Sequence, residues 1–177
     1  GGKIPPHIGI FGDEPEPEVS VEWMLEDVLL EGALSTMLLL PRPPQLELYY
    51  SSLMREIVTL APQQIAPSIG RTIRRFYVAS ADGVVRAEVL RRVADWFSVH
   101  LSNFKFTWAW NEWADDMTRA WAHPRPALAR RIVELEVRLA YYDRIKGTLP
   151  PDMEAYILPP FEPSPNFVYN RPSHSFQ

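Results

Sequence analysis

The eighteen prolines of this 177-residue chain set the lengths of the helices that it can form. Proline lacks a backbone N–H and restricts φ, so it ends or kinks a helix unless it lies in the first turn. No proline occurs from residue 68 to 123 or from 127 to 149, whereas the flanking segments are rich in it. The two proline-free stretches therefore have room for long helices, and the proline clusters mark turns and chain ends.

Apolar residues recur at helical spacing in five segments, which we expect to form helices. The segments are 20–40, 45–60, a third between the proline-bounded joint at 62–67 and the Asp82-Gly83 turn, 84–103 and 126–149. The inward face of the first is expected to carry Val21, Leu25, Val28, Leu29, Gly32, Ala33 and Thr36. The inward face of the second is expected to carry Leu46, Tyr50, Leu53, Ile57 and Leu60.

The last predicted helix, over 126–149, carries two apolar stripes. One stripe consists of Leu128, Ile132, Leu135, Leu139 and Tyr142. The other, on nearly the opposite side, consists of Val133, Val137 and Ala140. A helix with two apolar stripes lies between neighbouring helices rather than at the edge of a bundle.

Together these segments predict an all-α fold of stacked antiparallel helix pairs, an α-solenoid domain of the HEAT-like or armadillo type. We expect a proline-rich acidic leader over 1–19, a helical scaffold domain over 20–149 and a proline-rich C-terminal segment over 150–177. The C-terminal segment is expected to be extended or disordered, because proline is so frequent in it.

Large aromatic residues are concentrated between residues 96 and 113, which hold four of the six tryptophans and three of the eight phenylalanines. The helical period ends near Phe104 and gives way to alternation, which predicts an extended connector before a short helix capped by Asn111. We expect this connector to bury its rings between helix pairs. The predicted aromatic core consists of Trp96, Phe97, Phe104, Phe106, Trp108, Trp110 and Trp113.

Composition and charge exclude several classes of protein. The net charge is −4 and the pI about 5.6, whereas a dedicated nucleic-acid binder has a basic stripe and a high pI. The chain has no cysteine, so disulfides and thiolate metal sites are excluded. No apolar run reaches the roughly 18 residues needed to span a bilayer, and no signal peptide is visible. No cofactor is expected.

Several stretches resemble the large subunit of the nuclear cap-binding complex. The most specific are 96–104 (WFSVHLSNF) and 106–115 (FTWAWNEWAD), and the stretch 138–145 (RLAYYDRI) is also similar. Leu40-Pro41-Arg42-Pro43-Pro44 and, more weakly, Pro165-Asn166 with Pro172-Ser173-His174-Ser175 agree as well. Their order and spacing correspond from about residue 30 to 175, and the tryptophan-rich run contributes most of the specificity.

The resemblance implies that this chain corresponds to the second of three helical domains of the type found in the middle of initiation factor 4G. In that family, the small subunit is an RNA-recognition module that holds the methylguanosine cap. The large subunit orders that module and docks RNA-processing and export factors. The implied role is therefore a non-enzymatic nuclear scaffold, compatible with shuttling to the cytoplasm, that contacts capped RNA only indirectly and no membrane.

The tryptophans also allow a different hypothesis, direct binding of a methylguanosine cap or RNA. Two stacked rings from Trp108, Trp110 and Trp113, with the Glu112 carboxylate on the base edge, are the groups that a cap site needs. The alternative is that these rings are core, because the alternating spacing places Trp108 and Trp110 on the same side as Phe104 and Phe106.

No set of residues predicts catalysis. Asp115-Asp116 resembles part of an aspartate-rich metal motif of all-helical isoprenoid enzymes, but Arg119 stands where a third aspartate is needed. An isolated pair of carboxylates is usually a solvated helix face. The four histidines are far apart and lack metal-ligand spacing, so neither catalytic residues nor metal ligands are expected.

Two groups of residues are candidates for binding a partner protein. Six arginines lie between 71 and 92, and they either form a solvated face or bind acidic segments or RNA phosphate; Arg74 and Arg75 are the candidates. Tyr141, flanked by Arg138 and Arg144, lies off both apolar stripes if the helix is continuous. It is either an anchor for a docking peptide or a tyrosine covered by a neighbouring helix.

Overall fold

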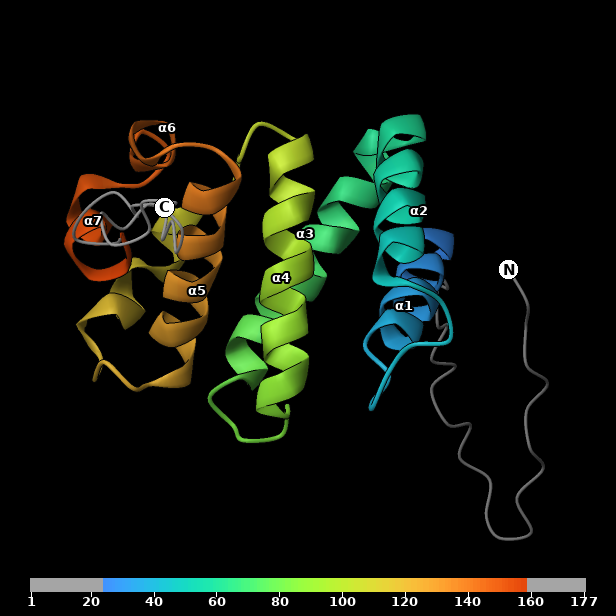
Figure 1. The fold of residues 1–177 in the computed structure, drawn as a ribbon, viewed down its shortest axis with the longest axis horizontal. Helices are drawn as coiled ribbons and strands as arrows, with labels where there is room; N and C mark the ends of the chain where they lie inside the picture. Colours follow the sequence, from blue (N-terminus) through green and yellow to red (C-terminus); the bar gives the residue numbers. More distant parts are fainter. Residues whose placement is uncertain (1–23, 159–177) are drawn as a thin grey trace, which may run out of the picture. The chain divides into compact units, whose positions relative to one another are not determined.

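The computed structural model describes residues 24–158, which divide into two compact units between Gly70 and Arg71. Every regular element in that range is a helix, so the predicted all-α class is confirmed (Figure 1). Val21, the leader and the end of the C-terminal segment, from residue 159 onward, lie outside the described residues.

In the first unit, α1 (Leu25–Met37) and α2 (Glu47–Leu60) pack against each other. The helix α3 (Pro62–Ala79) begins in this unit directly after Ala61. The core of the unit is built from Leu30, Leu34, Met37, Tyr50, Met54, Val58, Ile65 and Ile69.

The predicted inward face of α1 is wrong for its leucines and holds for Ala33, which is buried. Leu25 is 73% exposed and Leu29 is 40% exposed, whereas Leu30 and Leu34 are buried. In α2 the prediction holds for Tyr50 but not for Leu46 or Leu60. Both helices are apolar on more than one side, so periodicity alone does not select the side that meets the neighbour. Packing selects it, because only one side of each helix can face the other.

The predicted joint at 62–67 is also wrong, because both of its prolines lie in α3. Pro62 occupies the start of the helix, where a missing N–H has no consequence. Pro67 removes only one helical hydrogen bond just beyond the first turn. In the second half of α3, Ile73 and Tyr77 are buried.

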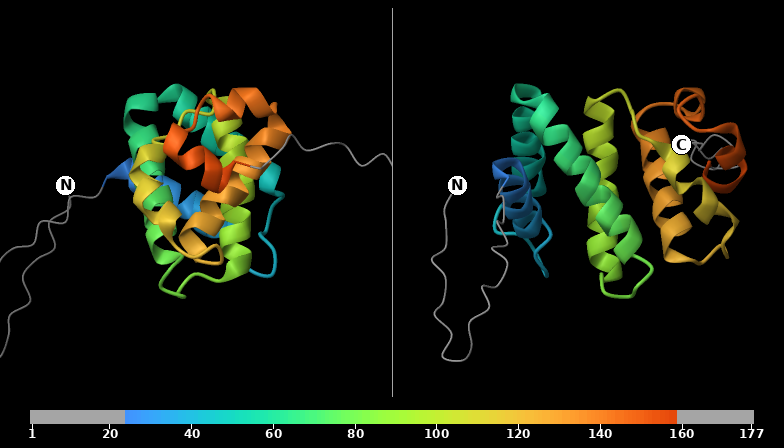
Figure 2. Two further views of the ribbon diagram at one scale, coloured as in Figure 1. Left: turned by 90° about the vertical axis from the view of Figure 1, so that its left-hand side faces the viewer. Right: turned by 180° about the vertical axis from the view of Figure 1, so that it is seen from behind.

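The second unit contains the end of α3, then α4 (Ala87–Asn103), the 3-10 helix η1 (Trp110–Thr118) and α5 (Pro124–Leu139). Two short helices follow, α6 (Tyr142–Lys146) and α7 (Pro151–Ile157). The helices α4 and α5 lie side by side and run in the same direction (Figures 1 and 2). On its other side α5 contacts η1, α6 and α7, so it lies between neighbours as its two stripes predict.

A single helix over 126–149 is not what forms. The helix α5 ends at Leu139, and Tyr141 has an extended backbone with φ −150° and ψ 156°. The break lets α6 and α7 fold back against α5, and Ile145, Met153 and Ile157 are buried as a result. A straight helix would carry Ile145 past the end of the core. The helical α7 also corrects the expectation of extended chain from residue 150.

The aromatic connector is a tight turn rather than a strand-like segment. Lys105 and Phe106 have φ of 62° and 59°, a left-handed conformation that costs an L-residue roughly 1–2 kcal/mol. The N–H of Phe106 donates to the carbonyl of Leu101 at 2.8 Å, and its ring is buried. Burial of a phenylalanine is worth roughly 1.5–3 kcal/mol, which is enough to offset the backbone strain of one such residue. Asn111 lies inside η1 and is not its cap.

Most of the predicted aromatic core is confirmed by burial. Trp96, Phe97, Trp110 and Trp113 are at most 2% exposed, and Phe106 is 5% exposed. Phe104 and Trp108 are only half-buried, because the turn at 105–106 breaks the alternation that would place all four connector rings on one side.

We expect Trp110→Ala to destabilise the protein by about 3–5 kcal/mol, the range for removing a large aromatic side chain from a core. Trp121→Ala is the matched control, because Trp121 is 75% exposed and its loss should cost less than about 1 kcal/mol. Denaturant unfolding followed by circular dichroism measures both values. Equal stability of Trp110→Ala and the parent chain would contradict the core assignment.

Candidate functional site

Trp113 is the centre of the aromatic cluster in the second unit. The Tyr77 ring of α3 stacks on it with centroids 4.0 Å apart and an interplanar angle of 2°. Trp108 and Trp110 meet Trp113 edge-on, at 5.4 Å and 5.5 Å between centroids. The four rings are therefore packed against one another, in the stacked and edge-to-face arrangements that stabilise aromatic cores.

The Glu112 carboxylate, at the edge of this cluster, is occupied by Arg74. The guanidinium donates two hydrogen bonds to it, from Nε and from Nη2, the latter at 2.7 Å. These hydrogen bonds lower the pKa of Glu112 and raise that of Arg74. Arg74 also lies over the Trp108 ring, 5.1 Å from its centroid. The pair joins α3 to η1 within the second unit.

This geometry is a closed cluster and not an open cage for a methylguanine. Tyr77 already stacks on Trp113, with the ring centroids 4.0 Å apart. A purine inserted between two rings would need those rings about twice as far apart as two rings in direct contact. Glu112 is engaged by Arg74 and does not present its carboxylate to a base edge. The arrangement therefore favours the core interpretation of the tryptophans.

A titration with a methylguanosine cap analogue should leave the tryptophan fluorescence of this chain unchanged beyond absorbance effects. The physical reason is that stacking on Trp113 would require Tyr77 to leave a buried position. Unmethylated GTP at matched absorbance is the control. Saturable quenching by the methylated analogue alone would overturn the core interpretation.

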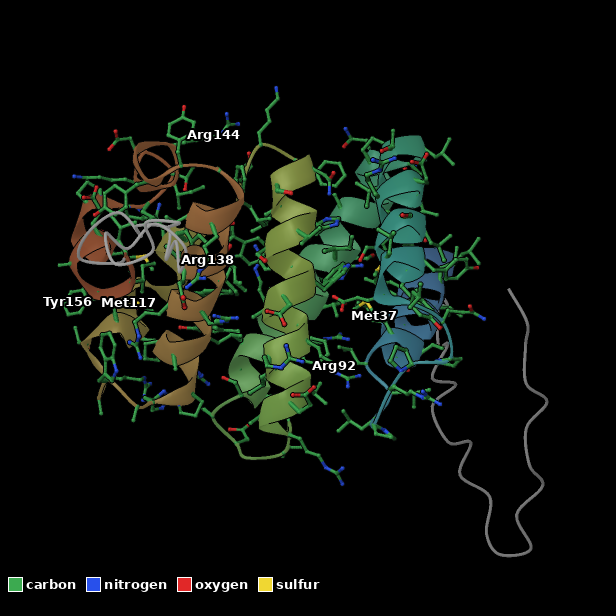
Figure 3. The ribbon with its side chains drawn as sticks, in the orientation of Figure 1. Met37, Arg92, Met117, Arg138, Arg144 and Tyr156 are labelled. Atoms are coloured by element: carbon green, nitrogen blue, oxygen red, sulfur yellow. The ribbon has the colours of Figure 1, made fainter. Side chains whose placement is uncertain are left out.

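The three candidate residues Arg138, Tyr141 and Arg144 do not lie on the one continuous helix that the sequence predicts. Tyr141 is 58% exposed, so it is not covered within the described part of the chain. Arg138 on α5 pairs with Glu134 at 2.7 Å, and Arg144 on α6 lies over the Phe106 ring at 5.5 Å. Figure 3 labels the two arginines on their helices. Tyr141 precedes α6 rather than continuing α5, so the helix-face argument for its exposure fails although the exposure itself is observed.

The predicted arginine group on α3 and α4 is largely engaged within the chain. Arg91 and Arg92 both donate to Glu88 and hold its pKa at about 2. Arg74 is bound to Glu112, while Arg75 is exposed on the surface. This pattern is closer to a solvated, ion-paired face than to a free anion-binding surface.

The Asp115-Asp116 pair is not arranged as a metal site. Asp116 binds Arg119, and Arg125 reaches it at 3.4 Å. Partial burial tends to raise the pKa of Asp116, but the hydrogen bond from Arg119 and the charge of Arg125 hold it below its ordinary value. Among the described residues, no three histidine, aspartate or glutamate side chains are placed to hold a metal ion.

Glu136 on α5 is a buried acid that the sequence analysis did not single out. Its side chain is fully buried, neither carboxyl oxygen has a hydrogen-bond partner among the described residues, and burial raises its pKa to about 8. By helical geometry it lies between the two apolar stripes, next to Ile132 and Val133. This burial could have been predicted from the position of Glu136 between the two stripes. When both stripes are covered by neighbouring helices, a side chain between them does not reach solvent.

Glu136→Gln should stabilise the protein at alkaline pH. In the unfolded chain this carboxyl ionises with its ordinary pKa of 4.5, whereas in the folded chain its pKa is about 8. Between pH 4.5 and pH 8 the unfolded state therefore loses the proton that the folded state keeps, so the free energy of unfolding falls as the pH rises. Each pKa unit corresponds to about 1.4 kcal/mol, and the total effect is on the order of several kcal/mol.

Denaturant unfolding at pH 5 and pH 8.5 tests this expectation. Glu136→Gln should match the parent chain near pH 5 and exceed it at pH 8.5. The control is Glu134→Gln, because Glu134 is partly exposed and paired with Arg131 and Arg138. Parallel stability curves for Glu136→Gln and the parent chain would show that Glu136 does not carry the pH dependence.

No helix among residues 24–158 is long and apolar enough to cross a membrane. The chain matches the family described as MIF4G like over residues 9–151. It is 38% identical over 152 residues to nuclear cap-binding protein subunit 1 of Schizosaccharomyces pombe. The matched region covers 86% of this chain and 19% of that protein.

Proteins of the same name in a plant and an animal are also similar to this chain. The Arabidopsis thaliana protein is 34% identical, with 85% of this chain and 18% of the relative covered. The Homo sapiens protein is 29% identical, with 72% and 16% covered. The chain thus spans less than a fifth of each of these relatives, and its predicted resemblance to the large cap-binding subunit is confirmed. The chain belongs to the MIF4G like family of helical domains.

Proposed function

We propose that this chain is a non-enzymatic scaffold domain of the large subunit of a nuclear cap-binding complex. The observation that carries the proposal is its identity of 29–38% with nuclear cap-binding protein subunit 1 from a yeast, a plant and an animal across most of its length. In this role it supports the small cap-binding subunit and docks RNA-processing and export factors. It works in the nucleus, with shuttling to the cytoplasm, and contacts capped RNA through the small subunit.

The structure supports a binding role in two ways. The tryptophans pack against one another, which is the arrangement of a rigid framework. The ion pairs on α4 and α5 make a continuous network, in which Arg131 reaches both Asp95 and Glu134 and joins the two helices. A stiff helical stack offers the fixed outer surface that docking partners need.

Tyr141 is the residue that we propose as a partner anchor on this framework. It is exposed at the break between α5 and α6, and tyrosine is enriched among residues that dominate protein interfaces. Arg138 and Arg144 are the flanking charges in the proposal. Arg74 and Arg75 are a second, weaker candidate, since Arg74 is already bound to Glu112.

Co-precipitation with the small cap-binding subunit tests the proposed function. The full-length protein that contains this domain should retain the small subunit. If neither the full-length protein nor this chain retains it, the proposed scaffold function is wrong. In the full-length protein, Tyr141→Ala should weaken the binding of a processing or export factor by roughly tenfold, the range of an interface hot spot.

Circular dichroism of Tyr141→Ala should be unchanged, because the side chain is exposed. Tyr156→Ala is the matched control, since Tyr156 is 45% exposed on α7 of the same unit. Equal loss of binding for both variants, or for neither, would remove Tyr141 from the proposed docking surface.

A further inference from the structure

Within residues 24–158, the first unit carries an exposed apolar face. We define this outer apolar face by six residues, Leu25, Leu29, Leu46, Tyr49, Leu53 and Leu60. Leu25, Leu46 and Leu60 are 73%, 79% and 82% exposed, values that are unusual for three leucines on one short helix pair. Isolated exposed leucines are ordinary, but a contiguous apolar surface marks an interaction site.

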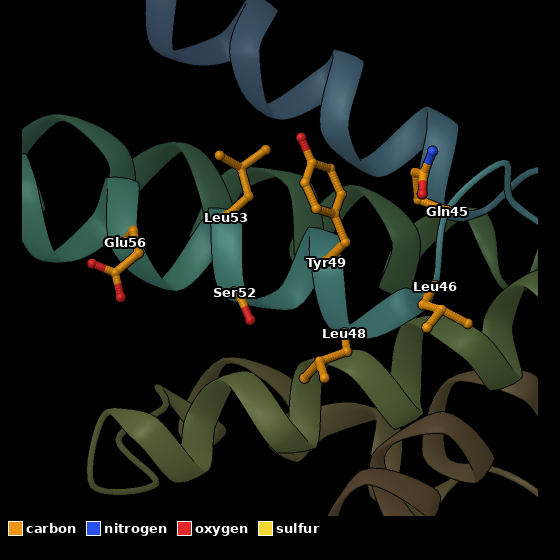
Figure 4. Close-up of a pocket in the computed structure, with 7 residues that line it drawn as sticks. All are labelled: Gln45, Leu46, Leu48, Tyr49, Ser52, Leu53 and Glu56. Carbon is orange, nitrogen blue, oxygen red and sulfur yellow. The ribbon is translucent and has the colours of Figure 1, made fainter.

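Two shallow grooves hollow this face. The larger, of about 510 Å³, is lined by Leu46, Tyr49 and Leu53 among others, and Figure 4 shows Tyr49 and Leu53 projecting from the same side of α2. The smaller, of about 290 Å³, is lined by Leu25 and Leu29 of α1 with Leu60 at the end of α2. Both grooves lie within the first unit; α2 lines the larger one, and the start of α3 contributes Gln64 and Ile65 to the smaller one.

The spacing of the apolar residues gives the face its shape. Tyr49, Leu53 and Leu60 are separated by four and seven residues, so they form a row along one side of α2, and Leu46 stands at the N-terminal end of that helix. This row runs beside the buried row of Tyr50, Met54 and Val58. At 1.5 Å per residue, the 14 residues of α2 extend about 21 Å, which matches a ligand helix of about four turns.

The surroundings of the face are acidic. Glu56 lines the larger groove and Glu26 lines the smaller one. Residues 24–61 contain five acidic and two basic residues, so the excess is three negative charges, and the pairing of Arg55 with Glu56 at 2.6 Å leaves that excess unchanged. An occupant with positive charge beside its apolar side chains is therefore favoured over a neutral or acidic one.

We propose that this face docks an amphipathic helix of a partner protein, with apolar residues at a spacing of three and four flanked by lysine or arginine. Helix-in-groove recognition uses this pattern of anchors. The proposal stands on this face alone and does not depend on the identity of the cap-binding partners proposed above.

Charge argues against the other occupants. A second copy of the chain would bring Glu26 and Glu56 of one molecule against the same acidic surface of the other. RNA and acidic lipid headgroups are repelled for the same reason. The leader over 1–19 has four acidic residues and one lysine, so it too has the wrong charge to be the occupant of this face.

The probe is a synthetic, fluorescently labelled helix of about four turns with a leucine stripe flanked by lysines. One control peptide replaces the lysines with glutamates, and another scrambles the order of the residues. Anisotropy should show saturable binding of the lysine peptide to the 177-residue chain and weak or no binding of the two controls. Equal binding of all three peptides, or binding of none, overturns the proposal.

Two sets of variants locate the binding. The double variant Leu46→Ser with Leu60→Ser should lower the affinity for the lysine peptide by roughly tenfold or more. Val84→Ser, at an 81% exposed site of the second unit, should leave that affinity unchanged. The double variant Glu26→Lys with Glu56→Lys should lower the affinity for the lysine peptide and raise the affinity for the glutamate peptide. Unchanged affinity in either set overturns the proposal. So does a dimer of the parent chain, seen by sedimentation, that Leu46→Ser with Leu60→Ser converts to monomer.

Discussion

The second unit depends on the packing of Trp113 against the rings that surround it. Tyr77 comes from α3, Trp108 from the connector and Trp110 from the first turn of η1, so the cluster joins α3 to the connector and η1, which lie farther along the chain. The Arg74–Glu112 pair fastens the same elements at the cluster's edge. Because the rings pack against one another, the cluster holds the framework together and leaves little surface on Trp113 for a ligand.

The position of α5 follows from that framework. One side of α5 packs on α4, and the other packs on η1, α6 and α7. This double contact explains why Glu136 is fully buried, since it lies between the two apolar stripes and has no exposed direction. A neutral carboxyl is tolerated there at the cost of a pH-dependent stability, which a helix at the edge of a bundle would not show.

The two proposed binding surfaces lie where helices of the described range are not covered. In the second unit, Tyr141 is exposed because the chain breaks between α5 and α6 and folds back. In the first unit, the leucines of α1 and α2 are exposed because each helix has more apolar positions than its partner can cover. Arginines flank Tyr141 and acids flank the apolar grooves, so the two proposals call for partners of different charge.

The all-α class, the limits of α2 and α4, and most of the aromatic core could be predicted from proline placement, helical spacing and the concentration of rings at 96–113. Local chemistry governs those features, because proline limits a helix wherever it stands and large rings are buried in almost any compact fold. The predictions failed where several local solutions were acceptable. Leu25 and Leu30 are equally apolar, and nothing near Ala140 forbids a continuous helix. Only tertiary packing decided that Leu30 is buried, that α5 ends at Leu139 and that Lys105 and Phe106 turn left-handed, since each choice is made by contacts with segments distant in sequence.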